Sequence, residues 1–192
     1  MLVLPVSSPT LPTHLRTVEE FESWQRQPGN DGSFEFVRGR LIPRSMQQDE
    51  VDIVDFLVRR FAQTACFRQK HLLMPQADSY VDATRKRIPN LAYFTPEQRQ
   101  AMRRGERVNT LFAIEILSES ETHHPERRPD VLDKIQDYFD GGARLVWYII
   151  PSHQRIDAYT SPENSTVFRG QQPITAAPVL PEFGFVVAEL FA

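Results

Sequence analysis

The chain has few of the features that would place it in a membrane or in a disulfide-bonded scaffold. Its 192 residues include one cysteine, Cys66, which excludes an internal disulfide and suits a reducing compartment. No apolar run reaches the roughly 18 residues that span a bilayer. The apolar residues 1–12 carry no basic segment and contain three prolines, which argues against a signal peptide. We therefore expect a cytoplasmic protein without a membrane partner, with an extended N-terminal arm over residues 1–16.

An excess of charge of one sign is also lacking. With 22 lysines and arginines against 25 acids, the formal net charge is −3, so the chain as a whole does not attract nucleic acid. There is no glycine-rich phosphate loop, and Ser118 and Ser120 have no His–Asp pair at a spacing that suits a catalytic triad. The adjacent His123 and His124 have no cysteine partner, which disfavours a zinc site. Contacts with phosphate would have to come from local basic clusters.

Hydrophobic periodicity predicts a single α/β domain over residues 1–192, with a mixed central sheet flanked by helices. Helical spacing, capping boxes and flanking turns predict helices near residues 17–27, 49–64, 95–105 and 131–140. Apolar runs predict strands near residues 34–37, 72–81, 88–94, 111–117, 145–150, 155–160 and 183–187. Arg38-Gly39 predicts a hairpin turn, and the strand–helix–strand order after residue 111 predicts a crossover connection.

Glu115 is the only charged residue in the apolar run LFAIEIL, residues 111–117. Continuous hydrophobicity predicts a strand that is covered on both faces, where a carboxylate needs a partner or a metal. A buried ion pair with an arginine is one interpretation, and a metal ligand is the other. Lys134 flanks the apolar face of the following helix. Its ammonium can reach along its aliphatic stem towards the strand, although a solvated lysine fits the pattern as well.

Asn90, Glu115 and Lys134 together resemble the PD-(D/E)XK nuclease constellation. In that constellation an acid after a proline and a second acid on the neighbouring strand hold Mg²⁺, and a lysine lies near the scissile phosphate. Magnesium prefers hard oxygen ligands and is commonly held by one or two carboxylates together with phosphate and water. A bound divalent ion lowers the pKa of a coordinated water and neutralises the charge that develops on phosphate.

The order of motifs is similar to that of the bacterial Uma-type endonuclease family, which has the restriction-endonuclease-like fold. The similarity runs from Thr17 to Phe191 and rests on six segments: TVEEF, FEFVRGRLIP, RIPNLAYFT, FAIEILSES, DKIQDYFDGGARLVWYIIP and APVLPEFGFVVAELF. This resemblance implies an endonuclease that acts on DNA with Mg²⁺ or Mn²⁺.

The resemblance also implies roles for individual residues. The metal ligands of the family fall on Asn90, Glu115 and the backbone carbonyl of Ile116. Lys134 takes the place of the lysine that the PD-(D/E)XK pattern has two residues after the second acid. Glu35 matches an acid in the hairpin of the family and lies at the edge of the same site.

The chain departs from the family pattern at the first metal ligand, where Asn90 replaces an aspartate. An amide keeps one oxygen ligand but loses its charge, which lowers the affinity for a divalent ion. Three explanations stay open. The protein binds nucleic acid without cutting it, the asparagine was introduced into an active enzyme, or Asp78 or Glu35 restores the charge. A histidine of the family is also replaced, with Glu50 as its approximate counterpart.

Basic clusters offer contacts with phosphate. The best placed is Arg85-Lys86-Arg87, which we expect on a hairpin turn that leads into Asn90. A second cluster spans residues 99–107. Neither has interleaved aromatic residues, which argues against dedicated binding of single strands.

Two further hypotheses concern partners. The alternative to a nuclease is a non-catalytic nucleic-acid-binding or interaction protein that has kept the nuclease fold, and Asn90 favours it. A homodimer is also expected, because the apolar arm and the strand with Trp147 and Tyr148 have apolar side chains that could contribute to an interface.

Overall fold

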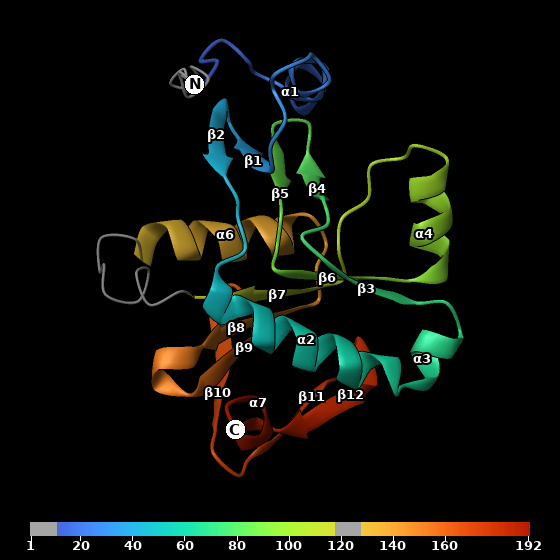
Figure 1. Cartoon of the computed structure of the whole chain (residues 1–192), viewed down its shortest axis with the longest axis vertical. Helices are drawn as coiled ribbons and strands as arrows, with labels where there is room; N and C mark the ends of the chain where they lie inside the picture. The colour runs from blue at the N-terminus through green and yellow to red at the C-terminus, as the bar shows by residue number, and fades with distance from the viewer. Residues whose placement is uncertain (1–10, 118–127) are drawn as a thin grey trace, which may run out of the picture.

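The computed structural model describes residues 11–117 and 128–192, and at its centre is a six-stranded sheet (Figure 1). The strand order is β10-β9-β8-β7-β6-β3. The bounds are β3 (Leu72–Pro75), β6 (Leu91–Phe94), β7 (Phe112–Ile116), β8 (Leu145–Ile150), β9 (Arg155–Ser161) and β10 (Asn164–Arg169). β7 and β8 are parallel, and the other neighbours in this sheet are antiparallel. The expected mixed sheet is therefore confirmed, and helix α6 (Arg128–Asp140) makes its crossover.

Helices cover both faces of this sheet (Figure 1). The bounds of the covering elements are α2 (Gln48–Ala62), α3 (Ala65–Arg68), β11 (Pro173–Ala176), β12 (Leu180–Val186) and α7 (Val187–Leu190). Phe112, Ile114 and Ile116 of β7 share a hydrophobic cluster with residues of α2 and of the β11–β12 hairpin. Ala113 lies on the opposite face, in a cluster with Ile135 of α6. β7 is buried along its whole length, as its continuous hydrophobicity predicts.

A second, four-stranded sheet stands beside the first and carries helix α1. Its order is β2-β1-β5-β4. The bounds are α1 (Val18–Gln25), β1 (Phe34–Val37), β2 (Arg40–Pro43), β4 (Ser79–Asp82) and β5 (Arg85–Arg87). The ring of Phe36 stacks on that of Phe21 in α1, with centroids 5.4 Å apart. The alternation along β1 is as predicted, since Phe36 faces α1 while Glu35 and Val37 line a pocket on the other side.

The predicted hairpin turn between β1 and β2 is confirmed. Arg38 has φ 48° and Gly39 has φ 85°, so both central residues are left-handed. A two-residue turn of this kind matches the right-handed twist of the flanking strands. The turn exposes the side chains of Arg38 and Arg40.

Two of the passages of the chain between the two sheets, from β3 to β4 and from β5 to β6, correct the predicted strands. The single strand predicted over residues 72–81 is wrong, because β3 and β4 belong to different sheets. Gln76 adopts a left-handed φ of 48° between them, which ends β3. The strand predicted over residues 88–94 begins later, at Leu91. Pro89 has no N–H to donate to a strand ladder, so residues 88–90 form the connection instead. Helix α4 (Pro96–Arg103) then starts with proline at its first turn, as predicted.

The expectation that Trp147 and Tyr148 form a dimer interface is wrong. They lie on β8, which runs between β7 and β9, and all six residues of this strand are buried. Trp147 packs against Phe112 and Phe183 within the core. The apolar character of this strand therefore reflects burial inside the chain. The homodimer stays a prediction, but β8 provides no interface for it.

Most of the expected N-terminal arm, residues 1–10, lies outside the described residues. The described remainder packs on the chain itself, since Leu15 is buried in a cluster with Phe21 and Phe36. Within residues 11–117 and 128–192, no helix is both long and apolar enough to span a membrane.

Candidate functional site

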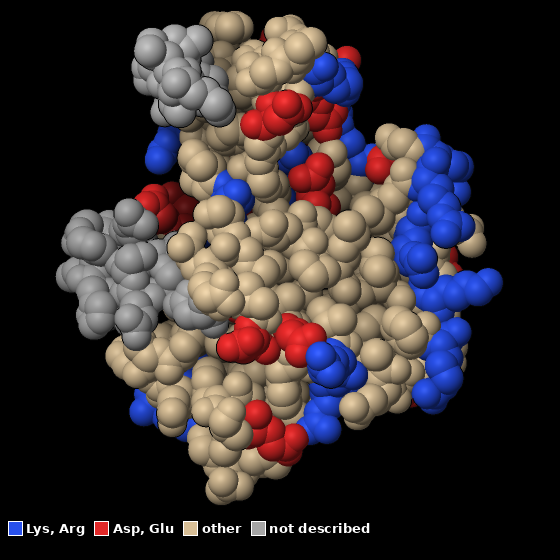
Figure 2. Space-filling model, viewed as in Figure 1, with Lys and Arg blue, Asp and Glu red and all other residues tan. Residues whose placement is uncertain are grey.

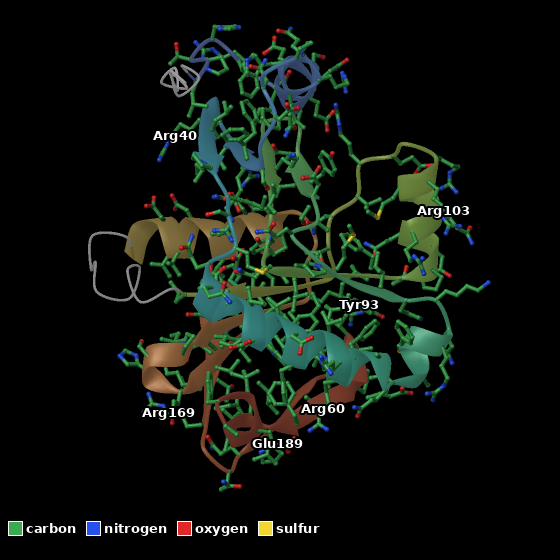
Figure 3. The ribbon with its side chains drawn as sticks, in the orientation of Figure 1. Arg40, Arg60, Tyr93, Arg103, Arg169 and Glu189 are labelled. Atoms are coloured by element: carbon green, nitrogen blue, oxygen red, sulfur yellow. The ribbon has the colours of Figure 1, made fainter. Side chains whose placement is uncertain are left out.

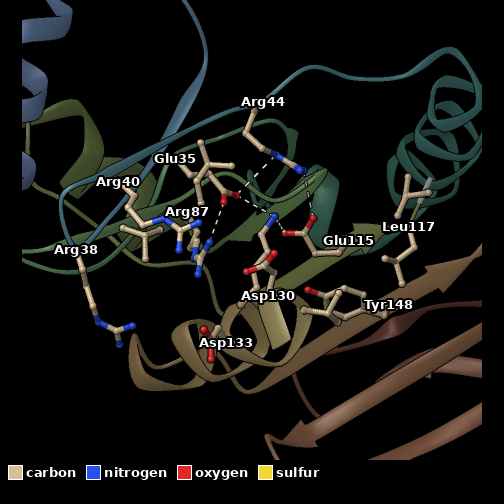
Figure 4. Close-up of a pocket in the computed structure, with 15 residues that line it drawn as sticks. Glu35, Arg38, Arg40, Arg44, Arg87, Glu115, Leu117, Asp130, Asp133 and Tyr148 are labelled. Atoms are coloured by element: carbon tan, nitrogen blue, oxygen red, sulfur yellow. Dashed lines mark hydrogen bonds and ion pairs between the residues drawn. The ribbon is translucent and has the colours of Figure 1, made fainter. Parts of the chain in front are cut away.

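A pocket of about 410 Å³ lies where the two sheets and α6 meet. The strands of both sheets contribute, because β1 supplies Glu35, β5 supplies Arg87 and β7 supplies Glu115. Figure 4 shows Glu35 of β1, Glu115 of β7 and Arg44, which follows β2, turned towards one another. The charged lining residues are Glu35, Arg38, Arg40, Arg44, Arg87, Glu115, Asp130, Asp133 and Lys134. Of the described residues that line the pocket, nine are charged and five of these are cationic, unlike the hydrophobic cores on either side.

Lys134 joins the two buried carboxylates of the pocket. Its Nζ lies 2.8 Å from Glu115 Oε1 and 2.9 Å from Glu35 Oε1. Both carboxylates are buried, at 3% and 2% exposure. The sequence predicted that Lys134 reaches towards the strand of Glu115, and the structure brings these two residues together. It adds that Glu35, from the other sheet, meets them at the same point.

Two residues that the sequence did not indicate complete this cluster. Arg44, just after β2, places Nη2 3.3 Å from Glu115 Oε2 and Nε 3.7 Å from Glu35 Oε1. Tyr138, on the same helix as Lys134, donates a short hydrogen bond from its hydroxyl to Glu115 Oε1. Tyr138 lies one turn after Lys134, so α6 offers Glu115 both a cation and a donor. A carboxylate in this setting is held in one orientation.

The cations around Glu35 determine its ionisation. Burial alone would raise the pKa of this carboxyl, but the charges of Lys134, Arg44 and Arg87 lower it to about 2. The backbone N–H of Ile88 also donates to Glu35 Oε1 at 3.1 Å. Glu35 is therefore ionised throughout the neutral range, which suits a cation ligand and excludes a role as a general acid there.

Arg85-Lys86-Arg87 is not the exposed turn that the sequence predicts, because these residues form β5 and their cationic groups are paired. Arg87 Nη1 lies 3.0 Å from Glu35 Oε2, and Arg87 Nη2 lies 2.5 Å from Asp137 Oδ2. Arg85 Nη1 lies 2.5 Å from Asp137 Oδ1. The predicted turn is wrong, and the sequence could not show the pairing, because Asp137 of α6 and Glu35 of β1 lie about fifty residues away in the chain.

Lys86 points to the opposite side of β5 and is 2% exposed. Its Nζ lies 2.9 Å from Asp78 Oδ1 and 4.8 Å from the centre of the Phe21 ring. Asp78, which was one candidate to restore the missing charge, is therefore directed to Lys86 and away from the pocket. Glu35, the other candidate, is inside it.

Asn90 lies beside β7 but is not among the described residues that line the pocket. Its Oδ1 accepts the backbone N–H of Ile116 at 2.9 Å, and its Nδ2 donates to Glu50 Oε2 at 3.0 Å. Asn90 is 1% exposed. The amide thus ties the end of β7 to helix α2, and its oxygen already has a partner. Glu50, the approximate counterpart of the family histidine, also accepts the N–H of Gln47 at the start of α2.

The oxygen atoms that line the pocket provide some, but not all, of the ligands that a hard divalent cation needs. Among the residues that the structure describes, no group of three or more His, Cys, Asp or Glu side chains is arranged to hold a metal. Two carboxylates do converge, because Glu35 and Glu115 share one lysine nitrogen. That number suits Mg²⁺, which is often bound by one or two carboxylates with the remaining positions left to water and phosphate. Ile116 also lines the pocket, whereas Asn90 does not.

The sequence profile of the Uma2 family, described as "Putative restriction endonuclease", matches residues 18–188. The chain belongs to the Uma2 family. A crystal structure from Anabaena variabilis, described as "a putative nuclease belonging to DUF820", has a similar fold, with a TM-score of 0.73 and 19% identity. The similarity covers 91% of this chain and 97% of that one. The search of curated proteins found no match. Family and fold together indicate a restriction-endonuclease-like nuclease and confirm the resemblance.

Several sequence expectations fall outside the described residues. These are Ser118, Ser120, His123 and His124. Of the residues that sequence reasoning missed, Tyr138 had a detectable signal, since it lies four residues after Lys134 on the same helix face. Arg44 had none, because its contacts depend on how the two sheets meet.

Proposed function

We propose that this member of the Uma2 family is an endonuclease that hydrolyses phosphodiester bonds in DNA with Mg²⁺ or Mn²⁺. The observation that carries the proposal is the convergence of Glu35 and Glu115 on Lys134, in an arginine-lined pocket. Family membership and the fold of the Anabaena variabilis structure support the class of reaction. The side chains of Glu35 and Glu115 and the backbone carbonyl of Ile116 would hold the ion. When bound, it would lower the pKa of a coordinated water and neutralise charge on the phosphate.

The chain's own cations suit the phosphate of the substrate. Lys134 is within hydrogen-bonding distance of both carboxylates, so an oxygen of a phosphate bound beside them lies in the field of its positive charge. Arg44 contributes a second cation at the same carboxylates. In a buried pocket these charges are screened less than at the surface, which favours the added negative charge of the transition state.

Asn90 serves in this proposal as a positioning residue. Its Oδ1 accepts a hydrogen bond from the N–H of Ile116, the residue that follows Glu115. Its Nδ2 donates to Glu50, so both polar atoms of the amide have a partner. The metal ligand expected at this position is replaced by Glu35, whose ionised carboxylate supplies the negative charge that an amide lacks.

The exposed turn of the β1–β2 hairpin is the best candidate for contacts with the DNA backbone. Arg38 and Arg40 are exposed at the rim of the pocket, and Figure 3 shows Arg40 pointing away from the hairpin. A second group, the basic band of Arg68, Lys70, Arg99, Arg103 and Arg104, follows α3 and α4. It forms the blue edge at the right of Figure 2, on the side away from the start of α6. Its position makes it a useful control for contacts near the pocket.

A nicking assay on supercoiled plasmid tests the proposal. The wild-type chain should nick DNA with Mg²⁺ or Mn²⁺ and should not do so in EDTA. Glu115→Gln, which keeps the size but removes the charge, should lower the rate at least ~100-fold, because the loss of about 3 kcal/mol of transition-state stabilisation has that effect. Glu163→Gln, an exposed acid on the turn between β9 and β10, should cleave at the wild-type rate.

A non-catalytic nucleic-acid-binding protein is the second candidate function. Asn90 at the position of the family acid favours it, as does the pairing of both pocket carboxylates with cations. In this case the wild-type chain and Glu115→Gln would both leave plasmid intact with either metal, and both would bind DNA with the same affinity. Metal-dependent nicking that Glu115→Gln lacks would exclude it.

A further inference from the structure

Tyr148 is a polar residue of the pocket that the proposed chemistry does not use. It lies on β8 directly across from Glu115, its partner in the parallel register of β7 and β8. Tyr148 lines the same pocket as Glu115 and Lys134. Figure 4 shows its hydroxyl end turned towards the Asp130 side of the pocket, away from Leu117. The residue is 4% exposed.

The hydroxyl of Tyr148 is buried without a hydrogen-bond partner among the described residues. Other tyrosines of the chain have one. Tyr138 donates to Glu115, and Tyr80 donates to Glu22 at 2.7 Å. A buried hydroxyl without a partner destabilises the folded state, and such groups are rare in folded proteins. A phenylalanine at this position would avoid the cost, so the hydroxyl serves something other than the fold.

The surroundings of Tyr148 determine what its hydroxyl can do. Burial raises its pKa, and the negative charges of Glu115 and Glu35 raise it further, so the group stays protonated at neutral pH. A protonated phenol donates one hydrogen bond to an acceptor. The pocket around it contains the cations of Lys134 and Arg44, which favour an anionic acceptor.

We propose that the Tyr148 hydroxyl binds a non-bridging oxygen of the phosphodiester in this pocket. This inference rests on the proposed function and adds a residue that contacts the substrate on the wall formed by β8. The phosphate then lies between the Lys134 ammonium and the phenol. A charge-assisted hydrogen bond of this kind contributes about 1.5–3 kcal/mol, which corresponds to roughly tenfold or more in affinity.

The test uses Tyr148→Phe, which removes the hydroxyl alone, and Tyr159→Phe as a matched control. Tyr159 lies on the neighbouring β9 with its ring edge to face with Tyr148, at a centroid distance of 6.2 Å. It is not among the described residues that line the pocket. The affinity of each full-length variant for the dinucleotide thymidylyl-thymidine is measured by NMR titration, and its Tm is measured by calorimetry.

Tyr148→Phe should bind the dinucleotide roughly tenfold or more weakly than the wild type. Its Tm should be equal to that of the wild type or higher, because an unpaired buried hydroxyl is removed. Tyr159→Phe should keep the wild-type affinity. If Tyr148→Phe binds the dinucleotide as well as the wild type does, or if its Tm falls by several degrees, the inference is wrong and the proposed function stands. If the wild type does not bind the dinucleotide, the inference is wrong, whereas the proposed function is wrong only if the wild type also leaves plasmid intact in the nicking assay.

Discussion

Lys134 and Glu115 form an ion pair of 2.8 Å between helix α6 and the central strand β7. Helix α6 connects the parallel strands β7 and β8, and its lysine pairs with the buried carboxylate of β7. Glu35 reaches the same ammonium from the other sheet, at 2.9 Å. Lys134 therefore joins the two sheets of the molecule within the pocket, where Arg44 contacts the same two carboxylates.

Lys134→Met should destabilise the fold, because two buried carboxylates lose the cation that they share. Breaking a buried pair on one side costs about 3–5 kcal/mol, and the remaining Arg44 keeps the expected loss near the lower end. Urea denaturation at pH 7 measures it. Arg59→Met, which breaks an ion pair with Asp55 on the surface of α2, should cost no more than about 1 kcal/mol. Equal losses in the two variants would show that Lys134 does not hold the carboxylates together.

The stability should depend on pH through Glu35. Its pKa is about 2 in the folded chain against an ordinary 4.5, so its contribution is present above pH 4.5 and is lost as the pH falls through 2. The shift corresponds to about 3 kcal/mol at ~1.36 kcal/mol per pKa unit. Unfolding free energies of the wild type and Glu35→Gln should therefore differ most at neutral pH and converge below pH 4.5. A difference that stays constant from pH 7 to pH 2.5 would contradict this assignment.

Asn90→Asp should destabilise the chain at neutral pH, although it restores the family's aspartate. The amide nitrogen of Asn90 donates to Glu50 at 3.0 Å, and a carboxylate there would place two buried acids side by side. One of them would then have a raised pKa, so the loss should shrink as the pH is lowered. Thermal unfolding at pH 5 and pH 8 measures this, with Asp31→Asn, an exposed change, as control. A variant that is more stable at pH 8 than the wild type would indicate that Asn90 has another environment.

The sequence predicted the residues at the centre of this site but not the charged residues that pair with them. Glu115 was evident as a charge in LFAIEIL, Lys134 from its helical position, and Glu35 from the alternation of β1 and the resemblance. Arg44 and Asp137 were missed, since their partners come from distant segments that meet only when the two sheets pack. The basic run of β5 looked exposed for the same reason.

Asn90 shows a second limit of sequence reasoning. Its position next to β7 was predicted, but the direction of its amide was not, because residues 88–90 leave the strand pattern at Pro89. The strand register alone cannot say whether such a side chain faces the pocket or helix α2. The hydrogen bonds to Ile116 and Glu50 answer that question for this chain.

Replacing Arg38 and Arg40 should weaken DNA binding and its salt dependence. Arg38→Asn suits the left-handed φ of that residue, and Arg40→Gln removes the second charge. Each lost phosphate contact should reduce the slope of log K against log salt by about 0.9, so the pair should reduce it by about 2. Arg68→Gln with Arg103→Gln, in the basic band, removes the same charge away from the pocket and should leave the slope unchanged. A larger effect of this second pair would place the DNA over α3 and α4.

Binding of Mn²⁺ tests the central claim most directly, because it requires no substrate and no turnover. Isothermal titration of the wild-type chain should show one site. Both Glu35→Gln and Glu115→Gln should abolish it or weaken it at least ~10-fold, since each removes one of two carboxylates. Glu163→Gln should bind as the wild type does. If Mn²⁺ binds equally well to the wild type and to Glu115→Gln, the paired carboxylates on Lys134 are not a metal site.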